Sequence, residues 1–358
     1  MDATLNDEES LLAETAGRVA AGLSGDAADV DADRAWRALD ESGFVAMRAD
    51  AGPGGASVVD AVLCAEAFGR AASAIPLVGP LLAVELLRVA GIGDDELVRG
   101  VLGPAGRSTA GGGVRATIAL DGTLGDVAGA PLGTAGAFEV AGTAVAFDAL
   151  GSSVAVALDD GVPATVDVGS PVVGSADLSR VVTGLSGEPR PIGGDVDAGR
   201  LERWRSFGLV LVGADMVGTM AGALAMAVDY ASQRRQFGRP IGSFQAIQHL
   251  CAEQHVSVEA ARSITYYAAW AVDHPDAADA PEVARVAKAY VGRVARQVGE
   301  AVIQVHGGIG HTWECDAHRY LRRLLVDRAV LGDEHHQEGE LAALIAGGDS
   351  PGGGGQPR

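Results

Sequence analysis

The feature that most constrains the fold is a series of long helical patterns, joined by short links, that fills residues 199–346. Apolar residues recur at helical spacing over 201–232, 242–273, 281–306 and 313–346. Gly238-Arg239-Pro240 interrupts the first pair, His274-Pro275-Asp276 interrupts the second, and the third pattern ends at Gly307-Gly308. Long helices with such short links favour an antiparallel four-helix bundle.

The most apolar window of the chain, residues 207–228, lies in the first of these helical patterns and contains Asp215 near its middle. A carboxylate at mid-window would be costly in lipid, whereas the many glycines and alanines suit close packing between helices. We therefore interpret this window as a core helix of the bundle and expect no membrane span.

Two regions with different sequence patterns precede the predicted bundle. Residues 1–111 carry shorter helical patterns, one ending at Gly43 and one beginning at Ser57, with Asp60 three residues further on. Between 112 and 198, glycine-rich turns separate short apolar runs at 117–120, 137–140, 144–147 and 153–158. We predict a mainly α protein with a β insert: an N-terminal helical domain (1–111), a small β barrel or sandwich (112–198), an antiparallel four-helix bundle (199–346) and a disordered glycine-rich tail (347–358).

Charge and cysteine content narrow the class of ligand. The net charge of −20 argues against binding of nucleic acid over a large surface, so the basic cluster near Arg234 stands out as a site for a small anion. The three cysteines lack CxxC spacing, which favours reduced thiols and a cytoplasmic protein, and the acidic start offers no signal peptide. His335-His336 near Glu338 has no second ligand cluster, so we expect a surface turn and no metal.

Two motifs lie at the ends of predicted helices. Arg234-Arg235-Gln236-Phe237-Gly238 leads through a proline to Phe244-Gln245, and Gln304-Val305-His306-Gly307-Gly308 ends the third helix. A guanidinium group can bind a small anion through a bidentate fork, and paired glycines let the backbone approach a ligand closely. The alternatives are a solvated helix end for the arginines, a C-cap for the glycines, a packed core position for His306 and a surface position for Gln304.

With the three-part order, the stretches 233–249 and 305–314 resemble the acyl-CoA dehydrogenase flavoproteins. The resemblance implies a tetramer in which the FAD of one subunit lies against the bundle of its neighbour. Arg234 would bind the pyrophosphate, Phe237 would pack near the cofactor, and Gln245 with Gln304, His306, Gly307 and Gly308 would meet the adenosine half. Gln236, inside the first motif, is a further candidate for binding the cofactor.

The catalytic half of that resemblance fails. The family uses a glutamate as the base that removes the α-proton of an acyl-CoA thioester, and the two positions where it is found correspond here to Gly332 and Gly208. Asp333 and Glu334 follow closely and could serve in a shifted register, although a solvated acidic turn is the simpler interpretation. The loop that contacts flavin and thioester in the family corresponds to 119–126, where its threonine, proline and serine pattern is lost.

These observations favour a non-catalytic subunit that resembles the smaller partner in α2β2 acyl-CoA dehydrogenases of actinobacterial steroid catabolism. A paralogous subunit would supply the catalytic glutamate and the pocket for a bulky, steroid-derived acyl-CoA, while an electron-transfer flavoprotein would take the electrons. Two alternatives remain open: a self-sufficient homotetrameric dehydrogenase with Asp333 or Glu334 as base, and a scaffold that has lost its cofactor.

Overall fold

The computed structural model describes residues 5–49, 55–92, 115–127, 144–171 and 175–348. The described portion of the N-terminal part contains the helices α1 (Asp7–Ala21), α2 (Ala32–Ser42), α3 (Val58–Arg70) and α4 (Val78–Val89), with 3-10 turns at Ala27–Asp29 and Ala46–Arg48. Two predicted helix boundaries are confirmed. Gly43 ends α2 in the left-handed conformation, and Ser57 caps α3 in a capping box with Asp60.

Within the described residues, the β part forms a closed barrel of five strands, so the sandwich alternative is wrong. Its strands are β1 (Ala116–Leu120), β2 (Val145–Phe147), β3 (Val154–Asp159), β4 (Val162–Pro171) and β5 (Thr183–Pro191), in the order β1-β2-β5-β4-β3. A parallel pairing of β1 with β3 closes the barrel. The sequence did not indicate β4 and β5, because their prolines, glycines and exposed polar residues obscure the alternation of a strand. The predicted run at 137–140 lies outside the described residues.

The C-terminal part contains α6 (Ala198–Gln233), α7 (Gln245–Asp273) and α8 (Ala280–His306), close to the predicted helices. The single helix predicted over 313–346 is wrong. A five-residue 3-10 helix (Gly307–His311) leads instead to α9 (Ala317–Ala329) and α10 (Glu334–Gly348). The helix is interrupted between α9 and α10 because Leu331 and Gly332 both have positive φ, at 59° and 89°.

Helix α6 is the central element of the molecule. It is long and apolar enough to cross a membrane, but 83% of its most apolar window is buried inside the protein, which confirms the interpretation as a core helix. It packs so closely on α3 that a Cβ atom at Gly218 would overlap the carbonyl oxygen of Glu66. The glycines of the apolar window therefore allow two backbones to touch.

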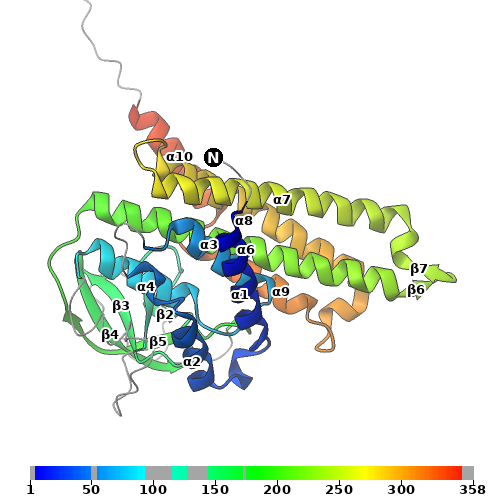
Figure 1. The fold of residues 1–358 in the computed structure, drawn as a ribbon, viewed down its shortest axis with the longest axis horizontal. Helices are drawn as coiled ribbons and strands as arrows, with labels where there is room; N and C mark the ends of the chain where they lie inside the picture. The colour runs from blue at the N-terminus through cyan, green and yellow to red at the C-terminus, as the bar shows by residue number, and fades with distance from the viewer. Residues whose placement is uncertain (1–4, 50–54, 93–114, 128–143, 172–174, 349–358) are drawn as a thin grey trace, which may run out of the picture.

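A continuous apolar core joins the three parts. It runs from α1–α4 through one face of the barrel strands β1, β2 and β3 to α6, α7, α8 and α9. Figure 1 shows the barrel at one end of the long axis and, at the opposite end, a small hairpin of β6 (Arg235–Gln236) and β7 (Arg239–Pro240) between α6 and α7. The first motif thus extends from the end of the bundle remote from the barrel.

Candidate functional site

The first motif forms an exposed hairpin. Helix α6 ends at Gln233, Arg234 is extended, and β6 pairs with β7 through a two-residue turn at Phe237 and Gly238, with φ of 51° and 78°. Phe237 is 92% exposed. A large aromatic residue at positive φ and in solvent is strained and loses the benefit of burial, a combination that points to a ligand or a partner.

The arginines of this hairpin are available to an anion. Arg234, Arg235 and Arg239 are exposed, and the side chains of Arg234 and Arg235 make no ion pair within the part of the chain that the structure describes. Arg239 lies over the ring of Phe244, with its guanidinium carbon 4.1 Å from the centroid. In a chain with net charge −20, guanidinium groups without carboxylate partners are suited to an external anion.

Gln245 is the first residue of α7 and is exposed. The preceding residue, Phe244, makes no side-chain hydrogen bond to cap this 29-residue helix, and Gln245 and Ala246 at its start are exposed. Helix N-termini of this kind favour anions through both their free N–H groups and the helix dipole.

The second motif lies at the same end of the bundle. Helix α8 ends at His306, Gly307 follows with a φ of 64°, and Gln304, Gly307 and Gly308 are exposed. The His306 ring is buried, stacks on Tyr230 of α6 at a centroid distance of 4.6 Å, and has Nδ1 2.8 Å from the carbonyl oxygen of Val302. The stack brings the ends of α6 and α8 together, but it also means that His306 supports the surface and does not face solvent.

Neither family position for the base has room for a side chain. A Cβ at Gly332 would overlap the ring of His336 and lie 2.8 Å from Nε2 of Gln337. A Cβ at Gly208 would overlap Cδ1 of Leu331 and lie 3.0 Å from Cδ2 of Leu82. A side chain at either position would therefore require the neighbouring side chains to move.

The two neighbouring carboxylates are engaged elsewhere. Asp333 accepts a hydrogen bond from the backbone N–H of His336 at 3.0 Å, which lowers the pKa of Asp333 and places it at the start of α10. Burial raises the pKa of Glu334, but hydrogen bonding from Arg328 outweighs it and the pKa is lowered. A general base for an α-proton needs a raised pKa, so the environments of Asp333 and Glu334 are opposite to what the chemistry requires.

The cleft beside these positions is small. The described residues leave a pocket of 150 Å³, which Arg205, Leu209, Arg285, Leu331 and Gln337 help to line. Sites for drug-sized ligands and cofactors have volumes of about 300–1,000 Å³. A flavin ring and a thioester do not fit together in the pocket as it stands.

The stretch 119–126 is docked against this cleft. The Asp121 carboxylate accepts hydrogen bonds from the backbone N–H groups of Thr123, Gly125 and Asp126, which closes a tight loop. The carbonyl oxygen of Leu124 accepts from the N–H of Leu331 at 2.7 Å, and Asp126 forms an ion pair with Arg205. The loop is therefore tied to the α9–α10 connection and to α6.

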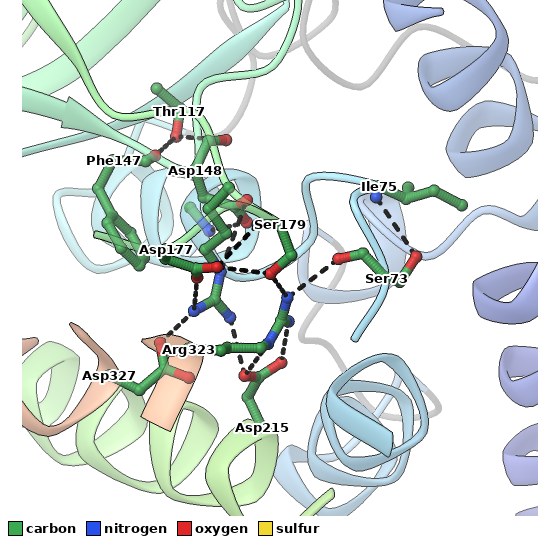
Figure 2. Close-up of polar contacts among 12 residues, drawn as sticks. Ser73, Ile75, Thr117, Phe147, Asp148, Asp177, Ser179, Asp215, Arg323 and Asp327 are labelled. Carbon is green, nitrogen blue, oxygen red and sulfur yellow. Dashed lines mark hydrogen bonds and ion pairs between the residues drawn. The ribbon is translucent and has the colours of Figure 1, made fainter. Parts of the chain in front are cut away.

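A buried charge network, which the sequence did not predict, joins all three parts of the molecule (Figure 2). Arg323 of α9 makes a bidentate pair with Asp215 of α6, with N–O distances of 2.9 and 2.6 Å, and also donates to the carbonyl oxygen of Ser73 and the hydroxyl of Ser179. Arg180 pairs with Asp215 at 2.8 Å. Asp215 inside the apolar window was the available signal, but its partners are distant in sequence.

Burial acts differently on the carboxyl groups of this network. It raises the pKa of Asp215, but the guanidinium groups of Arg180 and Arg323 outweigh it and hold the pKa of Asp215 well below its usual range. Burial keeps the pKa values of Asp327 and Asp148 raised despite the same guanidinium groups. The network thus holds a carboxylate at Asp215 and favours the protonated forms of Asp327 and Asp148. Among the residues described, no group of His, Cys, Asp and Glu is arranged to hold a metal ion.

Comparison with known proteins places the fold and the site in context. A family model described as the C-terminal domain of acyl-CoA dehydrogenase matches residues 206–345. Acyl-CoA dehydrogenase FadE27 of Mycobacterium tuberculosis is 30% identical over 310 residues, which cover 80% of each chain. Acyl-CoA dehydrogenase FadE34 of the same organism is 42% identical over 122 residues, but these span only 17% of its length. The chain belongs to the acyl-CoA dehydrogenase family.

Solved structures show the same fold over nearly the whole chain. The ChsE4–ChsE5 complex from Mycobacterium tuberculosis superimposes with a TM-score of 0.71 at 23% identity, covering 98% of this chain and 100% of the other. A variant of the steroid acyl-CoA dehydrogenase Tcur3481–Tcur3483 gives 0.74 at 23% identity, covering 97% and 100%. The expected mainly α fold with a β insert is confirmed.

Proposed function

We propose that this chain is a subunit of an FAD-dependent acyl-CoA dehydrogenase that acts as an α2β2 complex with a paralogous subunit. The reaction is the α,β-dehydrogenation of a bulky CoA thioester of the steroid-derived class. One contrast in the molecule supports this role. The hairpin that would meet a neighbour's cofactor is exposed, and its Arg234 and Arg235 form no ion pair with any described residue, whereas the space at both positions for a base, Gly208 and Gly332, is filled by other side chains.

The exposed end of the bundle fits FAD by its chemistry. Arg234 binds the pyrophosphate with help from the N–H groups at the start of α7, and Phe237 covers the cofactor from the hairpin tip. Gln236 and Gln245 line the approach, and Gln304, Gly307 and Gly308 meet the adenosine half through amide and backbone groups. His306 positions this last segment through its stack on Tyr230. When bound, FAD supplies the oxidation by accepting the hydride that leaves the substrate.

The partner provides what this chain lacks. It contributes the catalytic glutamate, the contacts to the flavin ring and the acyl-CoA pocket, and an electron-transfer flavoprotein reoxidises the complex. The neighbours ChsE4–ChsE5 and Tcur3481–Tcur3483 support pairing because two proteins are named in each. The free thiols of Cys64, Cys251 and Cys315 support a cytoplasmic location.

The alternatives fit the geometry less well. A self-sufficient enzyme with Asp333 or Glu334 as base would need a carboxyl group with a raised pKa facing a cleft large enough for substrate, and both pKa values are lowered. A pure scaffold would have no use for a strained Phe237 that is 92% exposed beside unpaired arginines.

The experiment is co-expression of this chain with paralogous acyl-CoA dehydrogenase subunits from the same genome. We expect a yellow complex with one FAD per αβ pair, and little flavin on this chain purified alone. Arg234→Ala should lower the FAD content of the complex at least tenfold under dilution, as loss of a charge-assisted contact worth about 1.5–3 kcal/mol implies. The matched control is Arg18→Ala, an exposed arginine on α1. Stoichiometric FAD on the isolated chain would refute the proposal.

A further inference from the structure

The connection between α9 and α10 is a rigid feature and not a loose turn. Residues 330–332 are buried although they join two helices, and Leu331 is only 4% exposed. The N–H of Leu331 donates to Leu124 of the barrel loop, and its carbonyl oxygen accepts from Nε2 of Gln337, both at 2.7 Å. The backbone of Leu331 is therefore held on both sides in a conformation, with φ of 59°, that leucine rarely adopts.

Lys288 of α8 also holds the α9–α10 connection in place. This is the only lysine among the 358 residues, the other 26 of the 27 basic residues being arginines. Its side chain is fully buried on α8, and Nζ donates to the carbonyl oxygens of Arg328 at 2.8 Å and Gly332 at 2.9 Å. A compact ammonium group can reach two carbonyl oxygens in a space where the planar guanidinium fork of arginine has a fixed geometry.

The side chain of Leu331 points from this fixed backbone into the cleft. It lies against α6 at Gly208, where it occupies the space that a side chain on α6 would need. The ring of His336 and the amide of Gln337 occupy the corresponding space at Gly332. What remains is the pocket of 150 Å³, bordered by the Asp126–Arg205 ion pair.

From this geometry we infer that Leu331 is a plug, positioned by Lys288, that closes this subunit's own cleft to flavin and acyl thioester. The inference rests on the proposed function and deepens it. The non-catalytic role is fixed by packing as well as by a missing carboxylate, so a glutamate at position 332 cannot by itself restore a site. Leu331 and Lys288 thereby determine the number of active sites in the complex.

The solitary lysine provides the test. Burial lowers the pKa of Lys288 from 10.5 to about 8, so at pH 8.5 much of the amine is neutral and would react with an acylating reagent that could reach it. We treat the purified complex, and in parallel this chain purified alone, with the N-hydroxysuccinimide ester of acetic acid and determine the mass of this chain by intact-mass spectrometry. Apart from the α-amine, Lys288 is the only amine on the chain that can add an acetyl group.

A closed cleft predicts that Lys288 reacts at least ~100-fold more slowly than in the urea-unfolded chain, with or without FAD. Leu331→Ala should raise the rate at least tenfold. Leu39→Ala, a fully buried leucine on α2, is the matched control and should leave the rate low. Fast acetylation of the native wild-type chain, or equal acceleration by both variants, would overturn the inference.

A second measurement addresses the site directly. Gly332→Glu should add neither flavin nor turnover to the complex, because its side chain has no space beside His336 and Gln337. A gain in FAD per complex with this variant would show an open second cleft and contradict the plug. The two proposals fail separately: FAD in the co-expressed complex tests the role of the hairpin, whereas the reactivity of Lys288 can be measured on this chain without any partner.

Discussion

The sharpest stability prediction concerns Arg323, the centre of the buried charge network. We expect Arg323→Met to destabilise the protein strongly, because methionine replaces the apolar part of the side chain but none of its four hydrogen bonds. Asp215 would lose its bidentate partner while staying fully buried, and Ser73 and Ser179 would lose a donor.

The size of the effect follows from these contacts. Removing one partner of a buried ion pair costs about 3–5 kcal/mol, and each unsatisfied neutral acceptor adds about 1 kcal/mol. Arg180 remains 2.8 Å from Asp215 and offsets part of the loss. We therefore expect the free energy of unfolding to fall by about 4 kcal/mol, which is close to a thousandfold in the equilibrium constant.

Urea unfolding of the wild type, Arg323→Met and Arg293→Met measures this difference. Arg293 is the matched control because its side chain is 59% exposed and its pair with Glu338 lies at the surface, so its loss should cost less than about 1 kcal/mol. Tryptophan fluorescence follows unfolding, and the buried Trp36, whose indole N–H donates to the carbonyl of Leu150 near the barrel, is one of the four tryptophans that contribute to the signal. If both variants lose the same small amount, the network does not hold the three parts together.

Three further predictions follow from the structure. Phe237→Asn should relieve strain at the hairpin turn, raising the stability of the isolated chain by about 1 kcal/mol in urea while lowering the FAD content of the complex; unchanged flavin would argue that Phe237 makes no cofactor contact. Because burial raises the pKa of Asp327, the folded protein keeps a proton that the unfolded chain releases, so wild-type stability from this group falls as pH rises above about 4. Asparagine has no such proton, so Asp327→Asn should cost most near pH 5 and least near pH 8; a cost independent of pH would contradict the protonated state. Burial lowers the pKa of Lys288, so the charged amine destabilises the folded wild type most below pH 8 and wild-type stability rises as the pH increases. The unfolding free energy of Lys288→Met minus that of the wild type should therefore decline by about 2 kcal/mol between pH 8 and 10. The same pH dependence in both proteins would exclude the shift.

Local patterns predicted much of the fold because they depend on near neighbours. The long periodic segments gave α6, α7 and α8 to within a few residues, and the Ser57 capping box and the Gly43 terminus depend on contacts of three or four residues. The division of 313–346 into α9 and α10 was missed because leucine at positive φ is disfavoured locally. That conformation is stabilised by hydrogen bonds to Leu124 and Lys288, which are remote in sequence, and to Gln337, which lies six residues after Leu331.

The candidate site shows the same division. The sequence identified Arg234, Phe237 and Gly307 as a set, since their residue types carry the chemistry of anion and dinucleotide binding, and their roles toward FAD stay a prediction. The Tyr230–His306 stack, which joins the two motifs, required the packing of α6 against α8. The same packing turned His306 inward, which a pattern of residues along one helix could not decide.

The sequence by itself determined the long helices α6, α7 and α8, the absence of a carboxylate at positions 208 and 332, and the cationic motif at 234–239. These are properties of residue identity and local spacing. Only the tertiary structure decided that the space at both glycines is already filled, that the single lysine holds the turn beneath Leu331, and that Asp215 inside an apolar helix is balanced by two arginines. The physical reason is that volume and charge compensation depend on which distant side chains meet.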